Sequence, residues 1–169
     1  ELNCWILGGS FVEKIPRSKR AYNTSVLIGP TGEIAATYRK IHLFDAEVGD
    51  ASVLESSTTA PGDRPVSVDT PLGRFGLTIC YDLRFPEIYR HLAMDGAEVM
   101  FVPSAFLAAT GRDHWMPLLR ARAIENQCWV VAPAQTGRHP LRLSSHGHTA
   151  VIDPWGDVVA MLDRGDGVV

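Results

Sequence analysis

The feature that most constrains the fold is an alternation of short apolar, β-branched runs with two stretches of helical periodicity. Each run is too short for a helix and is bounded by turn-forming residues, which is typical of strands. Strands are expected over residues 5–12, 23–28, 34–38, 75–79, 98–102, 129–132, 149–152 and 158–162. The first of these strands is expected to be buried, because it is apolar and aromatic. Helices are expected from Pro86 to a stop at Gly96, and from an Asp113 cap to Asn126. This order of elements predicts a mixed α/β domain.

Two turns and one long connection complete the expected organisation. Residues 29–32 (Gly-Pro-Thr-Gly) join two predicted strands into a hairpin, and residues 153–157 (Asp-Pro-Trp-Gly-Asp) join the last two. Residues 45–65 show no periodicity and are expected to form a long loop, which in compact domains is often functional. No repeat or interior linker interrupts the sequence, so residues 1–169 are expected to form one domain.

Composition excludes several classes of protein. Of the 169 residues, 46% are hydrophobic and 21% are charged, which is typical of a globular domain rather than a disordered chain. The net charge of -3 gives no basic excess for nucleic acid or an anionic membrane, and no apolar run reaches the roughly 20 residues of a membrane span. Three cysteines argue against a disulfide framework and favour a reducing, cytoplasmic location. The chain begins at Glu1 without an initiator Met, close to an apolar run, and stops at Val168-Val169 in what the pattern indicates is the middle of an element, so we expect it to be the interior of a longer protein.

Cys80 is the residue whose position best suits a nucleophile. It ends the strand predicted over residues 75–79 and precedes the helix predicted to begin at Pro86. A strand-to-helix turn places a side chain at the edge of a sheet and directs backbone N–H groups toward it. Those groups can lower the pKa of a thiol and stabilise an oxyanion. The alternative is a buried cysteine that closes a core strand, which is the better interpretation for Cys128 beside Trp129.

Two charged side chains fall in apolar surroundings. Lys40 follows a predicted strand and has Tyr38 and Ile41 as close neighbours, so its ammonium would need an anionic partner if the strand end is buried. The alternative is a solvated surface charge, the usual state of a lysine. Glu55 is the one carboxylate in an apolar patch of the predicted 45–65 loop, and alone it would be interpreted as a loop charge.

Other catalytic chemistries have weaker support in the sequence. His146 and His148 would share one face of a strand near His139, but no third ligand with metal-site spacing is close. A serine hydrolase of the elbow type would show Gly-x-Ser-x-Gly, which the sequence lacks. Residues 8–10 (Gly-Gly-Ser) are not a phosphate loop, because no Gly-Lys-Ser/Thr follows them.

Several short blocks carry a family likeness that spans most of the chain. The blocks are Tyr38–Asp45 (YRKIHLFD), Gly76–Glu87 (GLTICYDLRFPE), Pro103–Phe106 (PSAF), His114–Trp115, Arg120–Asn126 (RARAIEN), Gly147–His148 and Asp153–Gly156 (DPWG). Taken together and in this order, they resemble the nitrilase superfamily of carbon–nitrogen hydrolases. The likeness is closest to the amidase branch of deaminated-glutathione amidase and ω-amidase.

The resemblance implies a fold and a catalytic set. The implied fold is a four-layer α-β-β-α sandwich, of which this chain is expected to lack N- and C-terminal parts. The implied site comprises Cys80 as the nucleophile, Lys40 as the family lysine, Glu55 as a further structural and catalytic glutamate, and Tyr81 and Phe106 as pocket residues. The family's first glutamate, the general base, lies upstream of the segment that matches Trp5, and neither Glu1 nor Glu13 matches its motif.

The resemblance also implies an activity. The expected reaction is hydrolysis of a non-peptide carbon–nitrogen bond, in the amide of a small carboxylic acid, to acid and ammonia through a cysteine thioester. No metal or other cofactor is required for it. The substrate could be an ω-amide, an N-carbamoyl compound or a nitrile, and the sequence leaves that choice open. The alternatives are a catalytically silent binding or regulatory module on the same fold, and a metal-dependent hydrolase that uses His146 and His148.

The expected partners are a small-molecule amide and a second copy of the chain, with neither nucleic acid nor a membrane involved. In the family, the helices that match those from Pro86 and Asp113 lie at a subunit contact, which implies a homodimer or larger homo-oligomer. Four charged residues on or near these helices are expected to form buried or interface ion pairs rather than to contact substrate. They are Arg84, Arg120, Arg122 and Glu125.

Overall fold

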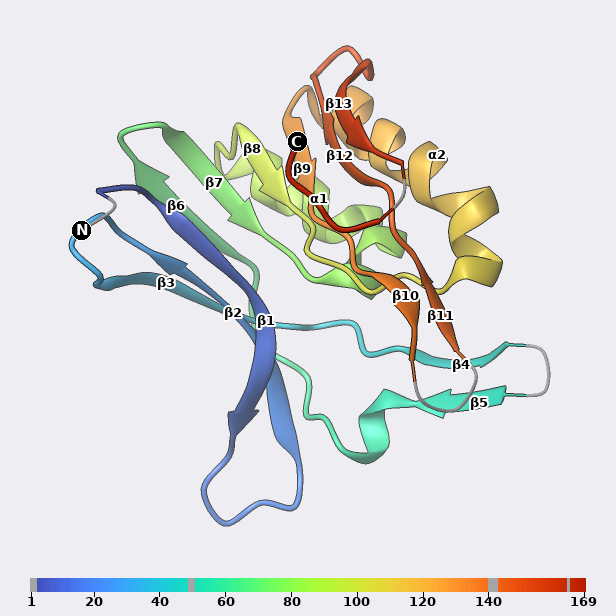
Figure 1. Cartoon of the computed structure of the whole chain (residues 1–169). Helices are drawn as coiled ribbons and strands as arrows, with labels where there is room; N and C mark the ends of the chain where they lie inside the picture. The colour runs from blue at the N-terminus through green and yellow to red at the C-terminus, as the bar shows by residue number, and fades with distance from the viewer. Residues whose placement is uncertain (1–2, 49–50, 140–142, 164) are drawn as a thin grey trace.

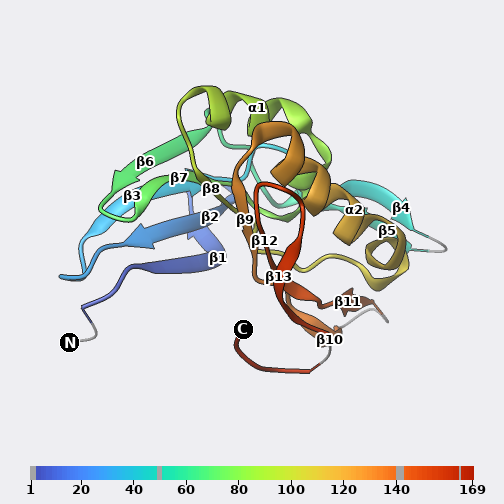
Figure 2. The same cartoon turned by 90° about the horizontal axis from the view of Figure 1, so that it is seen from above.

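Two sheets and two helices make up the centre of the computed structural model, which describes residues 3–48, 51–139, 143–163 and 165–169. The helices α1 and α2 cover one face of a six-stranded sheet, and a three-stranded sheet lies on the side away from them (Figures 1 and 2). A single cluster of buried apolar side chains links the helices to both sheets, with Tyr38 from the smaller sheet and Leu77 from the larger one. The prediction of a mixed α/β fold is confirmed.

The six-stranded sheet has the order β13-β12-β9-β8-β7-β6. Its strands are β6 (Val66–Thr70), β7 (Gly73–Leu77), β8 (Val99–Phe101), β9 (Trp129–Ala132), β12 (Thr149–Ile152) and β13 (Val158–Leu162). Strands β7, β8 and β9 run parallel. β6 pairs antiparallel with β7, β12 with β9, and β13 with β12. The central strands are joined through α1 and α2, because parallel neighbours need a crossover connection. The sequence predicted each of these strands except β6.

The three-stranded sheet consists of β1 (Ile6–Lys14), β2 (Ala21–Ile28) and β3 (Ile34–Arg39), paired antiparallel in that order. The predicted hairpin is confirmed, with Gly29 N–H donating to the Glu33 carbonyl across the turn. The expectation of a buried first strand is wrong. β1 is an edge strand, and 81% of the Val12 side chain is exposed.

Helix α1 (Pro86–Met94) begins at the predicted proline and buries Ile88, Tyr89 and Leu92 on one side. Helix α2 (Ala108–Asn126) ends as predicted, with Gln127 in the left-handed conformation at its C-cap. Neither helix in the described part of the chain is long and apolar enough to cross a bilayer.

The start predicted for α2 is wrong. The helix begins at Ala108, with Leu107 as its N-cap, so Asp113 lies inside the helix and caps nothing. The added turn contains Gly111, where an ideal Cβ would come within 2.5 Å of His146 Cβ. The glycine therefore lets this end of the helix pack closely on the segment that contains His146. No local sequence pattern predicts this interaction.

The segment expected to be a loop contains regular structure. β4 (Asp45–Val48) and β5 (Ala51–Leu54) form an antiparallel hairpin, and a 3₁₀ turn, η1 (Glu55–Ser57), follows it. Backbone pairing in a hairpin needs no alternation of apolar and polar residues. The sequence of β4 and β5 therefore gave no periodic pattern from which the hairpin could be predicted. A second small hairpin, β10 (Thr136–Arg138) with β11 (Ser144–His146), was also not predicted. Both hairpins extend from the same end of the molecule (Figure 1).

Candidate active site

Cys80 lies in the connection between strand β7 and helix α1. Thr78 and Ile79 continue the strand as buried residues, and Cys80 opens a 3₁₀ turn, η2 (Cys80–Arg84), that leads into α1. The φ angle of Cys80 is +48°, in the left-handed region that disfavours a side chain. Its N–H donates to the Pro103 carbonyl at 3.0 Å, which ties the turn to the end of β8. The predicted strand-to-helix position of Cys80 is confirmed.

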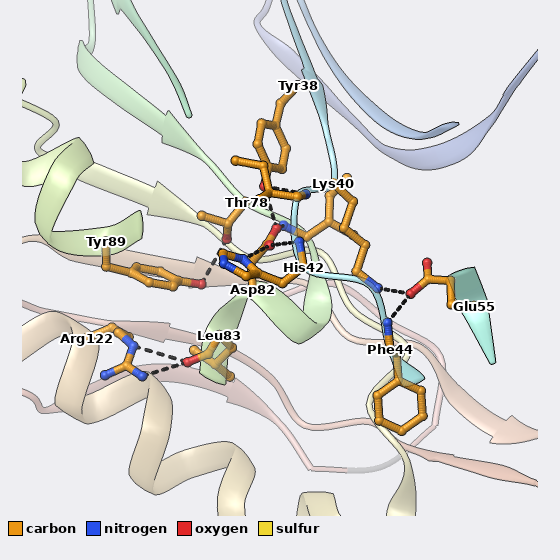
Figure 3. Close-up of polar contacts among 12 residues, drawn as sticks. Tyr38, Lys40, His42, Phe44, Glu55, Thr78, Asp82, Leu83, Tyr89 and Arg122 are labelled. Carbon is orange, nitrogen blue, oxygen red and sulfur yellow. Dashed lines mark hydrogen bonds and ion pairs between the residues drawn. The ribbon is translucent and has the colours of Figure 1, made fainter. Parts of the chain in front are cut away.

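The η2 turn is held from the helical layer as well. Arg122 of α2 donates from Nε and Nη2 to the Leu83 carbonyl, at 3.1 and 2.8 Å (Figure 3). Thr78 Oγ1 lies 2.9 Å from the Tyr89 hydroxyl of α1. These contacts hold the chain on both sides of Cys80, which is what a residue with a strained backbone needs in order to persist.

Lys40 and Glu55 form a buried ion pair. Only 3% of the Lys40 side chain is exposed, and its Nζ lies 2.5 Å from Glu55 Oε2 (Figure 3). The Phe44 N–H donates to the same oxygen at 2.6 Å, and Asn23 Nδ2 donates to Oε1 at 3.3 Å. The expectation that a buried Lys40 needs an anionic partner is confirmed. Its partner is Glu55, which its neighbours in the sequence would make a loop charge and which the family resemblance implies as a site residue.

One cavity of about 750 Å³ brings the predicted residues together. Its lining includes all five of them: Lys40, Glu55, Cys80, Tyr81 and Phe106. They come from the end of β3, the start of η1, the η2 turn and the segment before α2. Residues distant in the sequence therefore share one concave surface, which is the usual form of a small-molecule site.

The cavity also contains a cation that the sequence analysis assigned elsewhere. Arg84 lines it, with its Cζ 5.1 Å from the centroid of the Phe106 ring and its guanidinium 3.3 Å from His114 Nδ1. The ion pairs of the described residues do not include Arg84. Of the four residues expected to form ion pairs, Arg122 and Glu125 do so at 2.9 Å, while Arg120 donates to the Gly156 carbonyl.

The environment of Cys80 acts on its thiol in opposite directions. Burial raises the pKa of Cys80, whereas the Lys40 ammonium and a backbone contact with Ala105 lower it. Burial has the larger effect, so the pKa of the Cys80 thiol lies above its usual value. Lys40 therefore favours the thiolate, but the fall in the pKa of Cys80 that its strand-to-helix position suggested does not occur in this structure. Desolvation of a thiolate at the base of a pocket is the physical reason.

The histidine segment does not form a metal-ligand cluster. The rings of His146 and His148 stack with centroids 4.0 Å apart, and burial together with His148 lowers the pKa of His146. Within the described ranges, no group of three His, Cys, Asp or Glu side chains is placed to hold a metal ion. Cys128 is buried and donates from Sγ to the Ala97 carbonyl at 2.9 Å, which confirms its packing role.

The fold and this site define the class. The family model described as "Carbon-nitrogen hydrolase" matches residues 1–169, and the chain belongs to that family. Among curated relatives, a deaminated glutathione amidase from Synechocystis sp. is 52% identical over 159 residues, covering 92% of this chain and 58% of the relative. The Homo sapiens deaminated glutathione amidase is 48% identical over 175 residues, covering 99% and 53%. The chain thus spans just over half the length of these relatives.

Solved structures give the same assignment. The Caenorhabditis elegans NitFhit protein is 47% identical with a TM-score of 0.90, covering 96% of this chain and 40% of that one. A Saccharomyces cerevisiae member of branch 10 of the nitrilase superfamily is 36% identical with a TM-score of 0.87, covering 98% and 58%. An amidase from Nesterenkonia sp. AN1, with an acetamide group added covalently at its active-site cysteine, is 27% identical with a TM-score of 0.79, covering 91% and 55%.

Proposed function

We propose that the protein hydrolyses the amide of a small carboxylic acid to the free acid and ammonia, through a thioester on Cys80. The observation that supports this most directly is the shared cavity, because a thiol, an ammonium and a carboxylate line one pocket of the described residues. The deaminated glutathione amidases among the relatives, and the related amidase modified at its active-site cysteine, support the same chemistry.

In the proposed reaction, the Cys80 thiolate attacks the amide carbonyl carbon and forms a tetrahedral oxyanion. Lys40 would stabilise that oxyanion together with the N–H of Tyr81, which lies in the first turn of η2 where N–H groups have no intrahelical acceptor. One such donor is typically worth about 3 kcal/mol. Collapse breaks the carbon–nitrogen bond and releases ammonia. Water then attacks the thioester, giving the carboxylic acid and restoring the thiol.

Two carboxylates would divide the remaining work. Glu55 would orient Lys40, since its Oε2 accepts from both Lys40 Nζ and the Phe44 N–H. A glutamate upstream of the segment that matches Trp5, in the full-length protein, would carry the proton to ammonia and then activate water. No step in this scheme needs a metal or another cofactor.

Arg84 would select the substrate. Its guanidinium lines the cavity and lies over the Phe106 ring, so it could bind a carboxylate at the far end of the amide substrate. Arg84→Leu should then raise KM for an ω-amide of a dicarboxylic acid at least tenfold, while KM for the uncharged alkyl amide of equal length changes little. Equal changes for both substrates would refute this role.

The decisive experiment uses the full-length protein and the Cys80→Ala variant. Ammonia release should fall to background while the unfolding temperature stays close to that of the parent. Unchanged ammonia release would end the cysteine mechanism. A silent binding module on the same fold predicts no turnover in either protein and an unreactive thiol, and a metal-dependent hydrolase predicts activity that a chelator removes.

We also propose the rest of the architecture from the family likeness. The described residues provide a helical layer and two sheets, and a second helical layer on the outer face of β1–β3 would complete the four-layer sandwich.

The exposed side of α1, around Met94, would contact a second copy of the chain, with the mass of the full-length protein in solution as the test. A mass equal to one chain would refute the dimer.

A further inference from the structure

The side chain of Asp82 is fully buried between the segment that carries Lys40 and the turn that carries Cys80. Its Oδ2 accepts hydrogen bonds from the Tyr38 hydroxyl at 2.7 Å and from the Ile79 N–H at 2.8 Å (Figure 3). The mechanism proposed above does not use this carboxylate. Its burial and its position two residues after Cys80 therefore call for another explanation.

The second carboxylate oxygen of Asp82 binds His42, which follows Lys40 in the chain. Oδ1 accepts from the His42 N–H at 3.1 Å and from His42 Nδ1, which is the protonated ring nitrogen in this pairing, at 2.8 Å. The His42 ring also stacks on Phe85 at 3.8 Å between centroids, with an interplanar angle of 9°. His42 is thus fixed to the η2 segment by both its edge and its face.

The donors to Asp82 lie close in the sequence to both Lys40 and Cys80. Tyr38 and His42 lie two residues before and two residues after Lys40, and Ile79 immediately precedes Cys80. The Tyr38 hydroxyl also accepts from the Ile41 N–H at 3.2 Å, which adds a further link beside Lys40. One carboxylate therefore joins the backbone on both sides of the lysine to the backbone that enters the cysteine turn.

We propose that Asp82 is a positioning residue that sets the place of the Lys40 ammonium relative to the Cys80 thiol. This role rests on the proposed function, in which Lys40 stabilises the oxyanion formed at Cys80. Asp82 touches no reacting atom and acts only through the two segments that it links.

The chemistry of the donors explains why a carboxylate is required. Each oxygen of Asp82 accepts one backbone N–H, from Ile79 on one side and from His42 on the other. The Tyr38 hydroxyl can rotate and the imidazole can change tautomer, but a backbone N–H can only donate. In Asp82→Asn, either orientation of the amide places its NH₂ group against one of these N–H groups. The isosteric variant therefore separates the two segments without removing volume.

The test uses full-length Asp82→Asn, with two readouts. The first is the kcat and KM of amide hydrolysis. We expect kcat to fall about 100-fold, the usual cost of a misplacement of about 1 Å, with KM within threefold of the parent. The second is the pH dependence of iodoacetamide alkylation at Cys80, followed by mass spectrometry. Its midpoint should move to higher pH, because the thiolate loses the nearby ammonium.

The direction of that midpoint separates the proposal from a simple charge effect. If Asp82 acted on Cys80 only through its negative charge, which raises the pKa of Cys80, its removal would move the alkylation midpoint to lower pH. That result, or an unchanged midpoint together with an unchanged kcat, would overturn the proposal. Alkylation requires no turnover, so this readout stands apart from the Cys80→Ala test of the proposed function.

Two further variants keep the test informative if Asp82→Asn does not fold. Tyr38→Phe removes one donor to Asp82 without changing a charge, and should lower kcat about tenfold with the same upward shift of the alkylation midpoint. An unchanged kcat and midpoint in folded Tyr38→Phe would refute the linking role. Asp95→Asn is the matched control, because Asp95 is an exposed carboxylate bonded to Arg74 and Ser67 outside the cavity, and it should leave both readouts unchanged.

Discussion

At the scale of single residues, the Lys40–Glu55 pair decides what the cavity can do. An ammonium with 3% of its side chain exposed has lost most of its hydration, and the Glu55 carboxylate compensates that loss directly. The same carboxylate also accepts from the Phe44 N–H, so it fixes the chain that follows the lysine. Charge compensation and positioning are therefore carried by one side chain.

Glu55→Gln should expose both contributions. Because it leaves a buried ammonium without its counter-charge, we expect the free energy of unfolding to fall by about 3 kcal/mol. We expect kcat to fall about 100-fold, because Lys40 is no longer held in place. Urea unfolding and ammonia release measure the two effects. Glu47→Gln, on the exposed side of the adjacent hairpin, is the control and should change neither quantity.

Sequence reasoning reached some of the site residues better than others. Cys80 and Lys40 lie at strand ends with informative neighbours, so local patterns could single them out as candidates and the family resemblance then implied their roles. Glu55 and Arg84 depend on which side chains the folded chain brings close, and nothing in their immediate surroundings distinguishes a cavity residue from a surface charge. Asp82 was hidden for the same reason, since all of its donors except Ile79 come from another part of the chain.

At the scale of elements, one polar cluster ties the smaller sheet together. Glu13 of β1 binds the Arg39 guanidinium at 2.6 Å and also accepts from Thr24 of β2 at 2.7 Å. Arg39 is the last residue of β3 and immediately precedes Lys40. The cluster therefore connects all three strands close to the point where the chain enters the cavity.

This cluster predicts a pH-dependent contribution to stability. The Arg39 hydrogen bond lowers the pKa of Glu13 from 4.5 to about 2. A carboxylate with a lowered pKa stabilises the folded state above its unfolded pKa, and that stability is lost as the pH falls toward the folded value. The difference in unfolding free energy between the parent and Glu13→Gln should therefore be greatest above pH 5 and should shrink toward pH 2. A difference that stays constant between pH 7 and pH 3 would contradict the assignment.

The close packing of α2 on the segment before β12 predicts a second effect on stability. In Gly111→Ala, the new Cβ would lie 2.5 Å from His146 Cβ, so one of the two segments must move. We expect the free energy of unfolding to fall by about 2 kcal/mol, the usual cost of overpacking. Gly9→Ala is the control, because an added Cβ there meets nothing within 4 Å. Equal stabilities of the two variants in urea unfolding would refute the close contact.

Elements with a strong local signal were the ones that the sequence predicted. The start of α1 at Pro86 follows from the backbone preference of proline. The turns of the β2–β3 and β12–β13 hairpins follow in the same way from the glycines that they contain. The true start of α2 and the β4–β5 hairpin follow instead from packing and from backbone pairing. Neither leaves a periodic trace in the residues themselves.

At the scale of the whole molecule, the sequence constrained the class of fold but not its arrangement. Alternating strands and helices require parallel neighbours joined by crossovers, which is what β7, β8 and β9 show. The order of the six strands, and the place of the smaller sheet opposite the helices, depend on contacts between distant parts of the chain (Figure 2). The likeness to the carbon–nitrogen hydrolases implied a four-layer sandwich, of which the described residues provide one helical layer and two sheets.

The left-handed backbone of Cys80 has a consequence for the stability of the entire chain. Glycine adopts a φ of +48° without the steric cost that any Cβ brings, about 1 kcal/mol. Cys80→Gly should therefore be about 1 kcal/mol more stable than Cys80→Ala, as measured by urea unfolding, and a less stable glycine variant would contradict the strain. Selection for heat resistance alone would then favour a glycine at this position. In the proposed mechanism such a variant has no nucleophile, so directed evolution of a robust form would need an activity screen in every round.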